Sequence, residues 1–262
     1  MRLFSKKRQE SIFFYVFFYV IVGLFLLLFT QLSWAQNDHN EPGADSLNAV
    51  GDDQTSPLTP EQVIKRRRLS DLQLSFDGNR IALVVTEPVK ATQRTRNIWV
   101  YDAKTGGVLH FTTSKKSDFR PRWSPDSMTL AFLSNRSETT QIYLMPVNGG
   151  EAEALTQSKT GIRSFEWSPD GKQIAFLSAE PKTEEEEKKL KDKDDAYVVD
   201  GNIKDPLLRI IDLDSRQIRE LTRKPWRISE FVWMPQGDQL IISATNHPRR
   251  DLFSNHIYLI KA

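Results

Sequence analysis

A five-residue turn pattern occurs four times in the chain and constrains the fold more than any other feature. The copies are Leu74–Gly78, Trp123–Ser127, Trp167–Gly171 and Trp233–Gly237. In every copy a short apolar run begins seven residues after the first member, at Ile81, Leu130, Ile174 and Leu240. Because a fixed spacing repeated four times is hard to obtain by accident, we expect an array of one small structural unit.

The turn and the apolar run together predict a β-hairpin. In Ser-Pro-Asp-Gly, proline presets φ at the second turn position, aspartate can accept local backbone hydrogen bonds, and glycine tolerates a positive φ. The run that follows is apolar at successive positions rather than at alternate ones, which indicates a strand that is covered on both faces. Neighbouring sheets in a propeller would provide that cover.

Two further strands are predicted in each unit. β-Branched and aromatic residues indicate a third strand at 98–102, 142–145, 208–212 and 257–260. Glycine-containing turns follow at 104–107 and 148–150, and a fourth strand is expected to end at Phe111-Thr112, Leu155-Thr156 or Leu221-Thr222. Four strands in a unit of about 45 residues predict an all-β fold, a β-propeller of about four four-stranded blades.

The predicted propeller occupies residues 59–262, with blades at about 70–112, 118–156, 162–222 and 228–262. A short helix from Thr59 to about Arg67 precedes the blades, and Gln62 completes a capping box with Thr59. The last blade has three predicted strands and is expected to be incomplete. Because an open propeller exposes blade faces and strand edges, this favours a truncated protein, a fragment or one half of a split gene. A closed four-bladed propeller, with a strand supplied by the N-terminal segment, is the alternative.

The first 35 residues have the layout of a secretory signal peptide. A basic segment is followed by an uncharged apolar stretch at 12–29 and by the small-residue triplet Ser33-Trp34-Ala35. The pattern predicts cleavage after Ala35. An uncleaved membrane anchor at 12–32 is the alternative, because the stretch approaches the length of a membrane span. In both interpretations the rest of the chain is exported to the periplasm or the cell exterior. Residues 36–58 are then expected to be a flexible linker.

A charged insertion at 180–200 interrupts the third unit. Its acidic and basic residues predict a solvated, mobile excursion. Calcium binding is disfavoured, because Asp192, Asp194 and Asp195 are not accompanied by the glycine and closing glutamate of an EF-hand loop.

The repeated tryptophans and turn acids have simple structural interpretations. A large aromatic residue at the same place in successive units is expected to fill the same gap between blades. Asp126 and Asp170 could be ligands of a cation, but turn chemistry explains them without one.

Residue types that would carry chemistry do not form a site. The chain has no cysteine, which excludes disulfides, thiolate zinc sites and a cysteine nucleophile. None of its glycines is followed two residues later by serine, so the sequence contains no Gly-x-Ser-x-Gly motif. His110, His247 and His256 lie in no catalytic or metal-binding pattern. A formal net charge of +2 with no basic face predicted disfavours nucleic acid as a partner. We therefore predict no catalytic residues, no cofactor-binding residues, no metal ligands and no activity for the chain alone.

Several segments resemble a known family. Two segments resemble the start of the N-terminal propeller in prolyl oligopeptidase-family serine peptidases, of the acylaminoacyl-peptidase and dipeptidyl-peptidase type. The opening helix of that propeller is similar to Thr59–Gln62 with the basic run after it, and its first strand is similar to Leu72–Gly78. Further similar segments are 195–200, 207–212, 219–222, 243–246 and 251–258. The resemblance extends from about Pro57 to Ala262.

The resemblance implies a role in peptide hydrolysis. In that family the propeller caps a C-terminal α/β-hydrolase domain that cleaves short peptides, and it restricts which peptides enter. This chain matches the first half of such a cap, so its peptide partners would be reached through a hydrolase domain that these 262 residues lack. Two alternatives stay open: a propeller like that of the bacterial Tol system, which binds envelope proteins, and a small scaffold with no peptidase connection.

Overall fold

The computed structural model describes residues 59–89, 94–191, 205–223, 226–245 and 255–262. All of these residues belong to one compact unit, Pro57–Ala262. The predicted signal or anchor at 1–35, the predicted linker at 36–58 and the second part of the charged insertion lie outside the described residues. No helix within the described ranges has the length and apolar character needed to cross a membrane.

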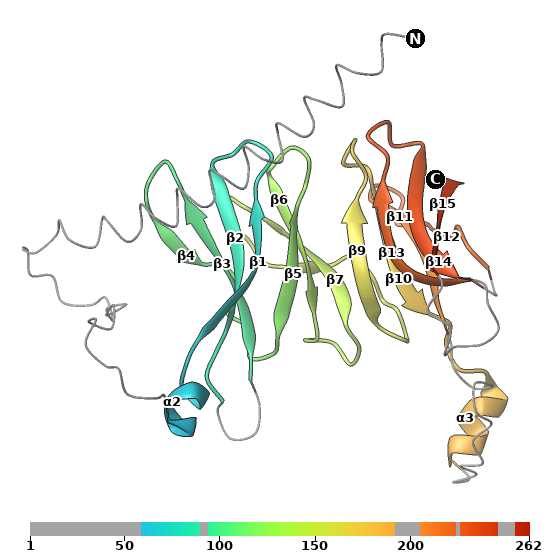
Figure 1. Ribbon diagram of the computed structural model, residues 1–262, viewed down its shortest axis with the longest axis horizontal. Helices are drawn as coiled ribbons and strands as arrows, with labels where there is room; N and C mark the ends of the chain where they lie inside the picture. The colour runs from blue at the N-terminus through green and yellow to red at the C-terminus, as the bar shows by residue number, and fades with distance from the viewer. Residues whose placement is uncertain (1–58, 90–93, 192–204, 224–225, 246–254) are drawn as a thin grey trace, which may run out of the picture. The chain divides into compact units, whose positions relative to one another are not determined.

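Four antiparallel sheets follow one another along the chain (Figure 1). The strands of each sheet are hydrogen-bonded in chain order, so each sheet is a simple meander. The first contains β1 (Arg68–Leu74), β2 (Arg80–Thr86), β3 (Arg96–Asp102) and β4 (Val108–His110). The second contains β5 (Asp118–Trp123), β6 (Thr129–Ser134), β7 (Gln141–Pro146) and β8 (Glu153–Ala154). The third contains β9 (Ile162–Trp167), β10 (Gln173–Ala179), β11 (Pro206–Asp212) and β12 (Ile218–Glu220).

The fourth sheet has three strands among the described residues, β13 (Arg227–Trp233), β14 (Gln239–Thr245) and β15 (His256–Lys261). This confirms the all-β propeller arrangement, with about four blades and three strands in the last. The successive apolar positions of β6 and β10 are buried on both faces, as the sequence predicts, because each sheet is covered by its neighbours.

The repeated turn closes the first hairpin of the first three blades through the same local side-chain hydrogen bonds. In the second blade Ser124 Oγ donates to Asp126 Oδ1 over 2.5 Å, and the backbone N–H of Met128 donates to the same oxygen over 2.9 Å. Gly171 adopts φ +71°, which glycine tolerates without strain. Ser127 adopts φ +61° at the equivalent position, where a side chain makes that conformation costly.

Neighbouring blades are joined by a hydrogen bond from each repeated tryptophan. The indole Nε1 of Trp123 donates to Gln73 O over 2.9 Å, that of Trp167 to Arg122 O over 3.1 Å, and that of Trp233 to Glu166 O over 3.3 Å. Each acceptor lies on the first strand of the preceding blade. The indole rings also belong to or pack against the three hydrophobic clusters found between the described blades. The structural interpretation of the tryptophans is therefore confirmed.

The fourth strands end at His110, Ala154 and Glu220, two residues earlier than expected. Each fourth strand is followed by an apolar residue and a threonine. The threonine hydroxyl accepts a hydrogen bond from the backbone N–H of a buried residue in the third strand. The pairs are Thr112 with Ile98, Thr156 with Ile142, and Thr222 with Leu208, all at 3.0 Å. The side-chain bond adds to the backbone bonds that Phe111, Leu155 and Leu221 donate to the carbonyl oxygens of the same third-strand residues.

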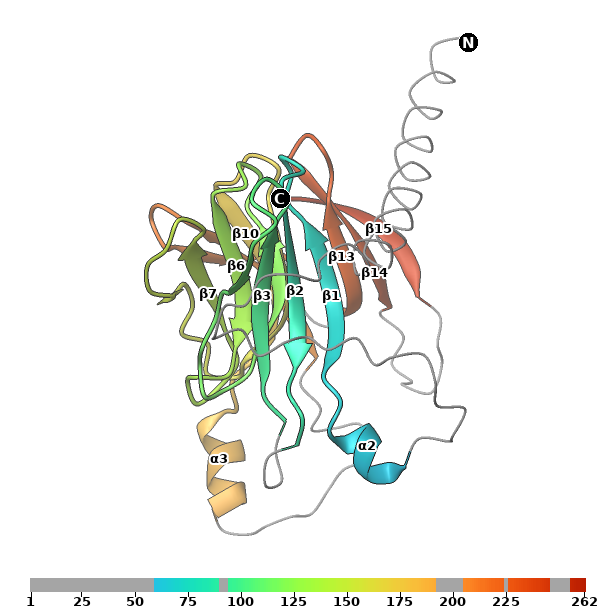
Figure 2. The same cartoon turned by 90° about the vertical axis from the view of Figure 1, so that its left-hand side faces the viewer.

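Two helices lie at the same end of the sheets (Figure 2). Helix α2 (Pro60–Ile64) has the predicted capping box, because Thr59 and Gln62 exchange bonds of 3.0 and 3.2 Å, but it is shorter than expected. The chain leaves the helix early, since β1 begins at Arg68.

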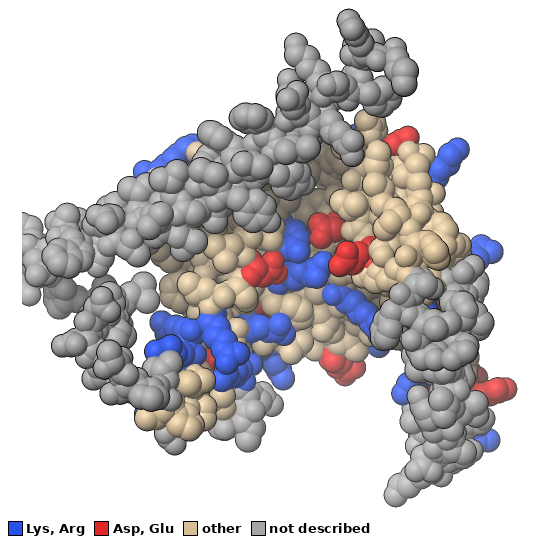
Figure 3. All heavy atoms as spheres, in the orientation of Figure 1, with Lys and Arg blue, Asp and Glu red and all other residues tan. Residues whose placement is uncertain are grey.

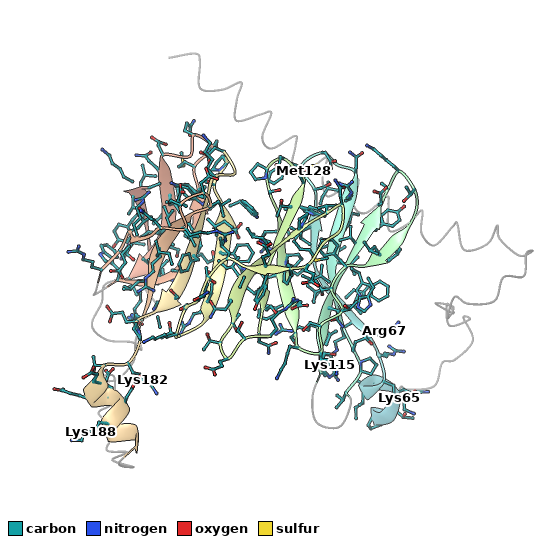
Figure 4. The ribbon with its side chains drawn as sticks, turned by 180° about the vertical axis from the view of Figure 1, so that it is seen from behind. Lys65, Arg67, Lys115, Met128, Lys182 and Lys188 are labelled. Carbon is teal, nitrogen blue, oxygen red and sulfur yellow. The ribbon has the colours of Figure 1, made fainter. Side chains whose placement is uncertain are left out.

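The second helix, α3 (Glu184–Lys191), was not expected within the charged insertion, although the exposure of residues 181–185 agrees with the predicted solvation. Thr183 and Glu186 form a second capping box there, and the acidic first turn suits the helix N-terminus. Figure 4 shows Lys182 and Lys188 at this end of the sheets, and Met128 at the opposite end.

Candidate functional site on the axial face

The first strands of the four sheets meet one another in chain order. β1 contacts β5, β5 contacts β9, and β9 contacts β13. We call the surface that these four strands form the axial face. Figure 3 shows basic and acidic side chains gathered in a hollow in front of it. Four of the charged residues on these strands interact with one another: Asp71, Arg120, Arg122 and Glu166.

Arg122 is the centre of this charged cluster. Its Nη1 lies 3.0 Å from Asp71 Oδ1 on the first blade and donates to Pro121 O over 2.7 Å. Its Nε lies 3.4 Å from Glu166 Oε1 on the third blade. The side chain is 19% exposed. One guanidinium group therefore ties three blades together, through residues that are 51 and 44 positions away in the sequence.

Arg120 is much less well paired. Its Nη2 lies 3.7 Å from Glu166 Oε1, the oxygen that Arg122 also uses, and its buried Nε has no hydrogen-bond partner in the described structure. Burial lowers the pKa of Arg120, and the positive charge of Arg122 lowers it further, while Glu166 and Asp71 act in the opposite direction. The side chain is nevertheless 35% exposed, so that solutes can reach it.

The backbone beneath the cluster is irregular. The pairing register shifts between Ser70 and Gln73 in β1 and between Phe119 and Arg122 in β5. Asp71 and Arg120 occupy these bulges with φ of 50° and 55°. A bulge changes the direction in which its side chains point, and the same device at equivalent places in two blades brings charged groups to the axial face.

The turn acids lie elsewhere. Asp126 and Asp170 line a shallow cavity of about 220 Å³ between the second and third blades, next to Trp167. Both carboxylates accept hydrogen bonds within their own turns, and the bond from Ser124 or Ser168 is the main reason why their pKa values are lowered. Turn chemistry is thus sufficient to explain them, as expected.

The histidines that the structure describes have separate aromatic partners. His110 stacks on Trp99 with ring centroids 4.5 Å apart, His256 lies near Tyr258, and His247 is outside the described residues. No group of three or more potential metal ligands occurs in the part of the chain that the structure describes. Asn97 and Asp118 each have a buried side-chain oxygen without a partner there, but neither faces a second candidate ligand in the contacts described.

Sequence reasoning missed the four charged residues of the axial face. The only signal was positional: Arg122 and Glu166 stand one residue before the repeated tryptophan, and Arg120 stands three before it, with Asp71 at the equivalent place in the first unit. Without knowing that the first strands converge, this spacing has no evident meaning.

Tandem four-stranded meanders, packed through a repeated tryptophan and meeting at their first strands, define a β-propeller domain. The chain belongs to the TolB beta propeller domain family, whose model matches residues 72–206, just over half of the sequence.

Two similar curated proteins are named as peptidases. The chain is 38% identical over 107 residues to the uncharacterized peptidase YuxL of Bacillus subtilis, a match that covers 40% of this chain and 16% of that protein. It is 30% identical over 86 residues to dipeptidyl-peptidase 5 of Porphyromonas gingivalis, covering 32% and 13%. The matches therefore span less than a fifth of these two curated relatives.

A solved structure shows the same fold. The acylaminoacyl peptidase of Pyrococcus horikoshii superposes with a TM-score of 0.57 at 20% identity, over 76% of this chain and 32% of that one. The two relatives confirm the similarity to peptidases that was noted in the sequence, and the solved structure confirms the propeller fold.

Proposed function

We propose that this chain is the propeller portion of a serine peptidase of the prolyl oligopeptidase type. In this proposal it contributes no catalytic residue and restricts which peptides reach an α/β-hydrolase domain. The observation that carries the proposal is the 38% identity over 107 residues to a protein named as a peptidase. The axial face supports it, because polar and charged side chains at converging strands suit a surface that peptides pass.

Labelling with a fluorophosphonate probe tests the peptidase link. Such probes react covalently with the activated serine of serine hydrolases. The protein that carries this sequence is immunoprecipitated from its own cells, without overexpression, after labelling. We expect a labelled hydrolase in the precipitate, either on the same polypeptide or bound to it, and loss of the label after heating. A precipitate that carries no more label than the one from a deletion strain would contradict the proposal.

We also propose that the propeller is exported to the periplasm or the cell exterior. The support is the basic, apolar and small-residue pattern of residues 1–35. Alkaline phosphatase fused after residue 58 should be active, because it folds only across the membrane, and a fusion that begins at residue 36 should be inactive. Protein sequencing then separates a cleaved signal, which gives Gln36 as the first residue, from an anchor at 12–32, which keeps Met1.

A protein-binding module like the Tol-system propeller is the second candidate. The family match favours it, since the matching model is that of the TolB propeller domain. Its partners would be envelope proteins rather than peptide substrates. An exported protein that is never associated with a labelled hydrolase, but is cross-linked to envelope proteins in intact cells, would favour this candidate over the first.

A further inference from the structure

We propose that Arg120 anchors a carboxylate-binding site on the axial face, which takes a carboxyl group of a peptide, either its C-terminus or an acidic side chain. The inference adds to the proposed function without resting on it. A peptidase propeller and a protein-binding propeller could both present such a site.

The first argument is the balance of donors and acceptors in the charged cluster. Each guanidinium group has several N–H donors and no acceptor. The acceptors that the structure gives to this pair are Asp71 Oδ1, Glu166 Oε1 and the carbonyl oxygen of Pro121. Arg122 uses all three, whereas Arg120 is near only one of them. Donors therefore exceed acceptors at Arg120, and a ligand that brings acceptor oxygens would correct this.

The second argument is distance. Charge-assisted N–H···O bonds are typically about 2.7–2.9 Å long. Arg122 approaches that range with Asp71, at 3.0 Å, but Arg120 stays 3.7 Å from Glu166. Glu166 accepts a hydrogen bond from Arg122, whereas Arg120 lies beyond hydrogen-bond distance of the same oxygen. A second carboxylate next to Arg120 would form the short bonds that Glu166 does not.

The third argument is the backbone at Arg120. A residue other than glycine in the left-handed region costs about 1–2 kcal/mol, and such residues are concentrated at binding and catalytic sites. Arg120 has φ 55° in a bulge of β5, and Asp71 has φ 50° in a bulge of β1. The conformation places an under-paired guanidinium at the partly exposed axial face, where it is 35% accessible.

The chemistry of the ligand follows from these observations. A planar guanidinium fork matches the two oxygens of a carboxylate. The neighbouring acids Asp71 and Glu166 would repel a doubly charged phosphate more strongly than a singly charged carboxylate. We therefore assign a carboxylate, and keep phosphate as an outcome that would overturn the assignment.

Fluorescence polarisation with three labelled peptides tests the site on the full 262-residue chain in detergent. The peptides are tetra-alanine with a free carboxyl terminus, the same peptide amidated, and amidated Ala-Ala-Glu-Ala. We expect the first or the third to bind at least about tenfold more tightly than the amidated tetra-alanine, as loss of a charge-assisted bond predicts. Which of the two binds identifies a terminal or a side-chain carboxylate as the natural ligand.

Three substitutions assign the binding to Arg120. R120Q should weaken binding of the carboxylate peptide about tenfold, while R120K, which keeps the charge but loses the fork, should have an intermediate effect. E166Q should strengthen binding several-fold, because it removes a competing carboxylate; a purely structural cluster would not show this gain. R216Q is the matched control, since Arg216 also has a positive φ, of 59°, but lies exposed in the turn between β11 and β12.

Four results would overturn the proposal. These are equal binding by wild type and R120Q, equal binding of all three peptides, no binding of any peptide at about 1 mM, or displacement by inorganic phosphate at concentrations where acetate has no effect. Melting curves of R120Q and R120K show whether both variants are folded. Neither export nor hydrolase labelling enters this test, so its failure is distinguishable from failure of the proposed function.

Discussion

The indole Nε1 of Trp123 donates a 2.9 Å hydrogen bond to the backbone carbonyl oxygen of Gln73, 50 residues earlier in the chain. The ring is 3% exposed and lies in the hydrophobic cluster between the first two blades. One residue thus contributes apolar burial and a directed bond to the same interface, and its counterparts Trp167 and Trp233 do so at the next two. Stability of the propeller is therefore expected to depend on these bonds between blades.

The substitution W123F tests the bond separately from the aromatic ring. Phenylalanine keeps most of the apolar surface but cannot donate, so we expect a loss of about 1–3 kcal/mol in the free energy of unfolding. W99F is the matched control, because Trp99 Nε1 has no hydrogen-bond partner in the described structure. Urea unfolding of both variants should show W123F to be the less stable by about 1 kcal/mol. Equal losses would mean that the indole bond contributes nothing beyond packing.

Ser127 combines a strained backbone with a bond between blades. Its φ is +61°, and its hydroxyl oxygen accepts a bond from the backbone N–H of Asp77 over 3.1 Å. S127A keeps the strain and loses the bond, so it should cost about 1 kcal/mol or more. S127G loses the bond but relieves a strain of similar size, and should stay within about 0.5 kcal/mol of wild type. Thermal unfolding measures the stability of the two variants, and we expect S127G to be the more stable. The prediction is wrong if S127A proves the more stable of the two.

Asp77 should make stability depend on pH in the acid range. Its bond from Ser75 is the main reason why its pKa is lowered from 3.8 to about 2, with Asn79 as the next contributor. A carboxyl group with a lower pKa in the folded state binds protons more readily when unfolded. Its stabilising effect is therefore complete above the unfolded pKa and is lost as the pH falls from about 4 towards 2.

D77N removes this titration. Urea midpoints measured between neutral pH and pH about 2 should fall less steeply for D77N than for wild type below pH about 4. Asp126 and Asp170, whose pKa values are lowered in the same way, continue to contribute a slope in the variant. Identical profiles for the two proteins would show that the Ser75 bond does not act through the charged carboxylate.

The ion pair between the buried Asp118 and the partly exposed Arg136 should be sensitive to the loss of the arginine. Asp118 is fully buried, and its Oδ2 lies 2.9 Å from Arg136 Nη2. R136M leaves a buried charge without its partner and should cost about 3–5 kcal/mol, while adding D118N should recover part of this loss. R67M, which breaks the exposed pair with Glu87, should cost less than about 1 kcal/mol. A double variant no more stable than R136M would argue against the buried charge as the cause.

The purified chain should not hydrolyse aminoacyl or peptidyl chromogenic esters. The reason is that its sequence contains no nucleophile motif and that its described histidines form no triad. The measurement is ester turnover with and without a serine-directed inhibitor, with a known serine peptidase as the positive control. Turnover that the inhibitor abolishes would show that the chain has catalytic residues of its own.

Much of the fold could be predicted because its signals are local. The turns, the strands that flank them and the capping box of Thr59 with Gln62 depend on residues only a few positions apart, so spacing and residue type are enough to identify them. The same reasoning overextended α2 to Arg67 and missed α3. There the composition of the charged run suggested solvation, and the capping role of Thr183 with Glu186 was overlooked.

The sequence by itself determined the repeat, the blades and the place of each tryptophan at a blade interface. Only the tertiary structure decided that Arg122 bridges Asp71 and Glu166 while Arg120 beside it does not reach a close partner. The physical reason is that these groups belong to different sheets, and their distances depend on how the sheets are rotated and staggered and on two bulges in the first strands. Such geometry results from packing across the whole domain, which no short stretch of sequence encodes.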